Sequence, residues 1–119
     1  MHRDHDIFTK AIKERKKIRL IFSDNDGRWQ AMSVIPLDYI PGRRATDKSS
    51  SYQFWDLKIG ANGSPLILFT EQIQGMEPDV QTFNSDDFIK VAWGENQHRR
   101  QFFIKRDWGF SPDQPQESQ

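Results

Sequence analysis

The sequence predicts a mainly β domain, in which one N-terminal α-helix precedes about five or six short strands that close into a small barrel. Apolar residues recur at helical spacing only near the N-terminus. From Ile18 onward, short apolar segments end at turn dipeptides such as Asp26-Gly27 and Asn62-Gly63. Closure of the sheet removes the edges that short strands otherwise expose to aggregation. The length of 119 residues fits a single domain.

The helix is predicted within residues 1–17. Asp4 or Asp6 can cap it, because a carboxylate accepts the free backbone N–H groups of the first turn. The basic run Lys13–Lys17 suits the negative C-terminal end of the helix and is interpreted as a solvated face, with steering toward nucleic acid as the alternative. The apolar residues on one side of the helix are Ile7, Phe8, Ala11 and Ile12.

Three strands are predicted next. Ile18–Phe22 leads through the Asp26-Gly27 turn into Arg28–Ile35. Pro36 marks a strand end or a bend because it cannot donate to a ladder, so Leu37–Ile40 is predicted as a separate short strand.

The second half of the predicted sheet begins at Tyr52–Ile59, the clearest strand, in which Trp55, Leu57 and Ile59 share one face. Asn62-Gly63 is a hairpin signal. The predicted elements that follow are the strand Pro65–Phe69, a helical turn at Thr70–Gln72, a last strand at Ile73–Met76 and a short helix from Ser85 to Ile89.

The predicted organisation is therefore a helix over residues 1–17, a barrel over 18–90 and a C-terminal extension over 91–119. The polar segment Gly42–Ser51 is predicted to be a mobile loop, and Ser111–Gln119 to be disordered.

Charge and cysteine content restrict the function. Lys+Arg and Asp+Glu both number 17, which excludes a globally basic nucleic-acid binder. Residues 1–58 nevertheless carry 12 basic and 8 acidic side chains, whereas residues 59–97 carry 1 and 6, so a local basic face is expected. The absence of cysteine excludes disulfides, a cysteine nucleophile and cysteine-based zinc sites. With no signal peptide and no long apolar run, we expect a soluble cytoplasmic domain that makes no membrane contact.

The order of these signals resembles the WYL domain family over about residues 7–89. The segments that carry the resemblance are Ile7–Phe22, Ser33–Leu37, Trp55-Asp56-Leu57 at the place of the family's Trp-Tyr-Leu motif, and Thr82–Phe88. The resemblance implies an SH3/Sm-like barrel behind an N-terminal helix. It also implies a non-catalytic ligand-sensing module that binds an anionic ligand, either a nucleotide or single-stranded nucleic acid.

Relatives in this family often accompany a DNA-binding helix-turn-helix in prokaryotic transcription regulators and defence systems. Only about 17 residues precede the predicted barrel here, so the resemblance implies a separate regulatory protein partner. The sequence departs from the family pattern at four positions. The motif tyrosine is replaced by Asp56, a strand-end tyrosine by Phe22, and two arginines by Met32 and Gln72, which removes two bidentate phosphate contacts.

The candidate ligand-binding residues combine guanidinium or ammonium groups with aromatic planes, the combination used for phosphate and base recognition. The Trp55–Leu57 pair is interpreted mainly as barrel core, with base stacking on Trp55 as the alternative. For the other candidate residues, the competing interpretation is that they belong to a solvated surface with no ligand. The candidates are Arg28, Trp29, Arg43, Arg44, Trp55 and Lys58.

The basic and aromatic stretch His98–Phe110 permits a second function. It suits single-strand binding or a partner groove, and it equally suits packing on the barrel or on a second subunit. A protein–protein interaction or homodimerisation module that uses Phe102-Phe103-Ile104 is therefore the alternative hypothesis.

Metal binding and catalysis are not expected. His2, Asp4, His5 and Asp6 have metal-like spacing but belong to a charged terminus, and Asp24–Gly27 lacks the downstream glutamate of a calcium loop. No nucleophile-elbow or phosphate-loop motif is present, so we predict no catalytic residues, no metal and no cofactor.

Overall fold

One helix and five strands make up the described part of the chain, which comprises residues 1–42, 50–57, 63–84 and 102–108 of this computed structural model. The elements are α1 (His5–Glu14), β1 (Lys16–Ser23), β2 (Trp29–Ile40), β3 (Ser51–Asp56), β4 (Ser64–Phe69), a 3-10 turn (Thr70–Gln72) and β5 (Ile73–Thr82). The mainly β class, the leading helix and the turn at Thr70–Gln72 are thereby confirmed.

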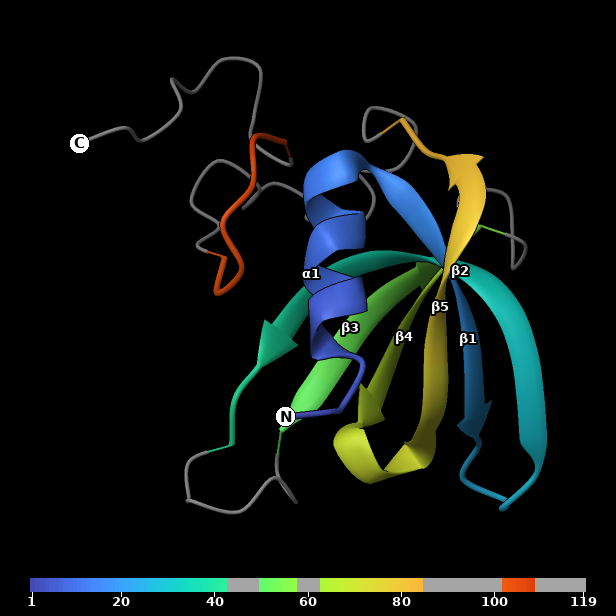
Figure 1. Ribbon diagram of the computed structural model, residues 1–119. Helices are drawn as coiled ribbons and strands as arrows, with labels where there is room; N and C mark the ends of the chain where they lie inside the picture. Colours follow the sequence, from blue (N-terminus) through green and yellow to red (C-terminus); the bar gives the residue numbers. More distant parts are fainter. Residues whose placement is uncertain (43–49, 58–62, 85–101, 109–119) are drawn as a thin grey trace.

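The strands form one antiparallel sheet in the order β4-β3-β2-β1-β5. The long strand β2 belongs to both halves of this sheet, and Figure 1 shows it sweeping across the molecule. Its residues 29–34 pair with β1, whereas residues 35–40 pair with β3. Two three-stranded halves are thus joined through a single strand.

The prediction of separate strands before and after Pro36 is wrong. Pro36 pairs with Phe54, and the register shifts between Pro36 and Asp38, so Leu37 forms a β-bulge. A bulge lets the strand bend and continue past a residue that has no N–H to donate. Two other strand ends also differ: β5 extends to Thr82 rather than ending at Met76, and β3 ends at Asp56 rather than at Ile59.

Closure of the barrel is not confirmed. No ladder joins β4 to β5 among the residues that the structure describes, and the sheet remains open between these two strands.

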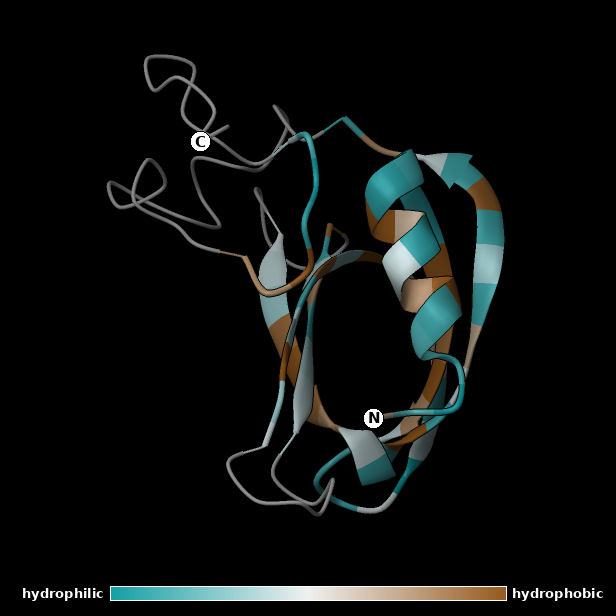
Figure 2. Cartoon of the chain, turned by 60° about the vertical axis from the view of Figure 1, so that its left-hand side comes forward, coloured by the Kyte–Doolittle hydropathy of each residue, from teal (hydrophilic) through white to brown (hydrophobic). Residues whose placement is uncertain are grey.

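Helix α1 lies against the sheet and ends earlier than expected, because Arg15 adopts a left-handed conformation with φ 56°. Its buried residues are Phe8, Ala11 and Ile12. The Phe8 ring meets Tyr52 edge-on at a centroid distance of 4.8 Å and Phe54 at 5.5 Å. Figure 2 shows polar residues along much of the visible surface of the helix. Full burial of a large apolar side chain such as Phe8 or Ile12 contributes about 1.5–3 kcal/mol.

The segment of residues 102–108 packs on the domain itself. The backbone N–H groups of Phe103 and Ile104 each donate to the Asp38 carboxylate at 3.1 Å, and Trp108 Nε1 donates to the Ile12 carbonyl at 2.7 Å. The described residues of this segment therefore cover their own domain, and packing on a second subunit stays a prediction.

Residues 43–49 of the predicted loop Gly42–Ser51, the predicted helix at Ser85–Ile89 and the predicted disorder of Ser111–Gln119 lie outside the described residues. At the end of that predicted loop, Ser51 is instead the first residue of β3. Within the described ranges, no helix combines the length and the apolar character needed to cross a bilayer.

Candidate functional site

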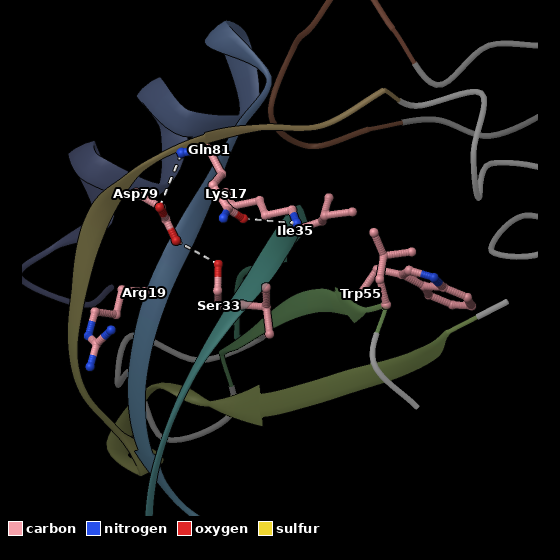
Figure 3. Close-up of a pocket in the computed structure, with 9 residues that line it drawn as sticks. Lys17, Arg19, Ser33, Ile35, Trp55, Asp79 and Gln81 are labelled. Atoms are coloured by element: carbon pink, nitrogen blue, oxygen red, sulfur yellow. Dashed lines mark hydrogen bonds between the residues drawn. The ribbon is translucent and has the colours of Figure 1, made fainter. Parts of the chain in front are cut away.

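A pocket of about 300 Å³ opens on one face of the β5-β1-β2 half of the sheet. It has a charged end and an apolar end, and Figure 3 shows Asp79, Ser33, Lys17 and Gln81 grouped together, with Trp55 on the opposite side. The residues that line it are Lys17, Arg19, Ser33, Val34, Ile35, Trp55, Leu57, Asp79 and Gln81.

Strand alternation places two cations on this face. Ile18 and Leu20 of β1 are buried in the core, so Lys17 and Arg19 point to the opposite side of the sheet. Their Cα atoms are about 6.6 Å apart, since residues two apart on a strand share a face at about 3.3 Å per residue. Arg19 faces Ser33 across the β1–β2 ladder.

The Asp79 carboxylate organises the charged end of the pocket. Ser33 Oγ donates to Asp79 Oδ2 at 2.6 Å, and the Gln81 N–H donates to Asp79 Oδ1 at 3.1 Å. The Ser33 hydrogen bond, followed by the Gln81 N–H and the more distant Lys17 charge, lowers the pKa of Asp79 below its ordinary value. Asp79 is therefore ionised at neutral pH. Lys17 Nζ donates to Gln81 Oε1 at 3.3 Å, which holds the ammonium on this face of the sheet.

Trp55 forms part of the apolar end, but it is only 4% exposed. The backbone explains this burial in part, because Gly63 has φ +91° and lies against Trp55 Nε1 so closely that a Cβ atom would collide with it. An open stacking platform needs an exposed ring face. The burial favours the core interpretation of Trp55, and its contribution to the pocket is an apolar wall.

Arg28 and Trp29 lie at the β1–β2 hairpin and do not line the pocket. Trp29 is 63% exposed and pairs with Ser23. The positions of Trp29, Ser33 and Ile35 differ by even numbers along β2. Trp29 therefore lies on the same face of the sheet as Ser33 and Ile35, which is the face that carries the pocket. It is about 13 Å from Ser33 along the strand.

Arg43, Arg44 and Lys58 lie outside the described residues, so only Trp55 of the six sequence candidates is placed in the pocket. Sequence reasoning missed Lys17 because it belongs to the basic run Lys13–Lys17, which also fits a solvated helix end. It missed Arg19 because this residue lies within the predicted apolar strand Ile18–Phe22. It missed Asp79 and Gln81 because the predicted last strand ended before them. A period-two pattern of charge along Lys17-Ile18-Arg19-Leu20 was the available signal.

The residues with metal-like spacing at the N-terminus have other roles. His2 Nδ1 accepts the Asp4 N–H at 2.9 Å, so Nε2 carries the proton and donates to the Ile73 carbonyl at 2.8 Å. His5 Nδ1 lies 2.8 Å from the Tyr52 hydroxyl, and burial lowers the His5 pKa. Across the described ranges, no group of three or more His, Asp or Glu is arranged for a metal ion.

No protein-family model matches the chain, and neither a curated protein nor a solved structure matches it.

Proposed function

We propose that this chain is a non-catalytic binding module of the WYL type, and that it senses a small anionic ligand, a nucleotide or a short single-stranded nucleic acid, in the pocket beside β1. The proposal rests chiefly on the paired cations Lys17 and Arg19, which share one face of one strand at the border of a pocket. With the ionised Asp79, the lining residues carry a net charge of +1, although the whole chain has a formal charge of 0.

The wider proposal is an SH3/Sm-like barrel left partly open between β4 and β5. The strand order, the shared bent strand β2 and the 3-10 turn before β5 support it. A ligand-sensing module of this kind would act in the cytoplasm with a regulatory protein partner, in transcription regulation or defence.

Binding should depend on the two pocket cations rather than on total charge. We expect the double variant Lys17→Gln/Arg19→Gln to weaken binding of nucleoside monophosphates and of a four-nucleotide single-stranded DNA by about ten-fold or more, since charge-assisted hydrogen bonds are each worth about 1.5–3 kcal/mol. Isothermal titration calorimetry at low salt, where screening is weakest, measures this effect.

The matched control is Lys10→Gln/Lys13→Gln, which removes the same two charges from α1. Lys10 and Lys13 are both exposed, and neither lines this pocket. Equal loss of affinity in both double variants would mean that binding follows net charge and not this pocket. Absence of any binding by the unmodified protein would refute the proposed function.

The alternative of a protein–protein or homodimerisation module remains a prediction. Phe102, Ile104 and Trp108 are at most 8% exposed on their own domain, whereas Phe103 is 57% exposed. Of the described part of this segment, only Phe103 presents a large apolar surface to a partner.

A further inference from the structure

The polar end of the pocket contains a feature that an anion site alone does not need. Asp79 places a negative charge among the cations that would attract an anion, and a plain phosphate group gains nothing from it. A ligand that matches the whole pocket therefore carries N–H donors for Asp79 in addition to a negative group for Lys17 and Arg19.

The carboxylate of Asp79 has acceptor capacity left for such donors. Each carboxylate oxygen has two lone pairs. Ser33 occupies one position on Oδ2, Gln81 occupies one on Oδ1, and the Val80 N–H also contacts the carboxylate. These contacts fix the orientation of the carboxylate at the pocket, and the lone pairs that they leave are available to donors of a ligand.

Two adjacent N–H donors fit two carboxylate oxygens in the parallel geometry that makes bidentate pairs strong. Among the common nucleobases, guanine alone presents such a pair, N1–H and the 2-amino group, on one edge. Adenine and cytosine place an acceptor beside their amino group, and uracil places carbonyl oxygens on both sides of N3–H. An ionised carboxylate repels these acceptors.

We propose that the pocket selects guanine mononucleotides, with Asp79 accepting the N1–H and 2-amino protons and Lys17 and Arg19 attracting the phosphate. This inference rests on the proposed function and adds the identity of the base. The apolar wall of Ile35, Trp55 and Leu57 contacts the remaining part of the ligand. The pocket volume of about 300 Å³ lies at the lower end of the range for small-molecule sites, which favours a mononucleotide over a longer chain.

The test compares GMP, IMP and AMP by isothermal titration calorimetry on the full chain. IMP is the informative probe, because it differs from GMP only by the missing 2-amino group. We expect GMP to bind about ten-fold or more tightly than IMP, since one hydrogen bond to a charged group is lost, and AMP to bind no better than IMP. We expect Asp79→Asn to reduce the preference for GMP over AMP to about two-fold or less while AMP binding persists.

Asp6→Asn is the matched control, because it makes the same carboxylate-to-amide change at an exposed position of α1 that does not line the pocket. It should retain the GMP preference, and circular dichroism should show that both variants are folded. Equal affinity of the unmodified protein for GMP and AMP, or a GMP preference that persists in Asp79→Asn, would overturn the guanine assignment. If the affinities for GMP and AMP still fall in the Lys17→Gln/Arg19→Gln double variant, the proposed anion-binding function stands and only the guanine assignment is refuted. Failure of all three nucleotides to bind would refute both.

Discussion

At the scale of single residues, Asp38 connects two parts of the chain that are far apart in sequence. Its carboxylate accepts the N–H groups of Tyr39, Phe103 and Ile104, and it lies 3.4 Å from Arg106 Nη2. The Arg106 guanidinium is also stacked 3.8 Å from the Phe102 ring centroid. Both members of this ion pair are buried, with side-chain exposures of 6% for Asp38 and 0% for Arg106.

We expect Asp38→Ala to lower the free energy of unfolding by about 3–5 kcal/mol, because removal of one partner leaves a buried cation and backbone donors without their acceptor. Urea denaturation followed by tryptophan fluorescence measures this change. Asp107→Ala is the control, because Asp107 is 67% exposed and pairs with Arg15 at the surface, where such pairs are worth about 1 kcal/mol or less. Similar losses in the two variants would contradict the role given to Asp38.

At the scale of elements, the turn between β3 and β4 fixes the wall of the pocket. Gly63 has φ +91°, and a Cβ atom at this position would approach the Asp56 carbonyl oxygen at 2.8 Å and collide with the Trp55 ring. Gly27 in the β1–β2 turn also has a positive φ of +79°, but nothing lies within 4 Å of the place of its Cβ. A comparison of alanine variants at Gly27 and Gly63 therefore distinguishes the free-energy cost of backbone conformation from the free-energy cost of steric crowding.

We expect Gly27→Ala to cost about 1 kcal/mol of stability, from backbone strain alone, and Gly63→Ala to cost at least 2 kcal/mol more, in the range of overpacked sites. Thermal and urea unfolding of both variants measure the difference. Gly63→Ala should also change the near-ultraviolet circular dichroism of Trp55. Equal costs at the two sites would show that the contact with Trp55 imposes no constraint.

The two outer strands of the sheet are blocked in different ways. Just after β4, the Thr70 N–H donates inward to Ser50, so the alternate residues Pro65, Ile67 and Phe69 direct their backbone groups outward. At the two ends of this set, Pro65 has no N–H, and the Phe69 N–H donates to Gln72 Oε1 at 3.0 Å. On β5, side chains of the N-terminal segment bind the backbone at three points, in which His2 contacts Ile73, Arg3 contacts Gln74 and Asp4 contacts Met76.

At the scale of the whole molecule, these contacts oppose extension of the sheet by another chain. We expect deletion of His2, Arg3 and Asp4 to expose the outer edge of β5 and to increase self-association at high protein concentration. Multi-angle light scattering of the deletion variant and the full chain measures the change. Replacement of the same three residues by alanine should have the same effect, because the side chains make these contacts. Unchanged mass in both variants would show that the segment does not protect the edge.

The sequence predicts the order of elements better than the site. Local signals such as Asp26-Gly27 and the Ile7–Ile12 pattern identify turns and the helix, because short-range chemistry determines them. The pocket depends instead on which distant strands become neighbours. Lys17 and Asp79 are brought together by the β1–β5 ladder, and no local pattern encodes that pairing.

The continuity of β2 across the bulge at Leu37 connects the pocket to the C-terminal segment. Ser33 and Ile35 line the pocket before the bulge, and Asp38 holds residues 103–106 just after it. A change in the bend angle at this bulge moves the pocket wall and the segment's attachment point relative to each other. Strand β2 therefore couples the position of the pocket wall to the position of residues 103–106.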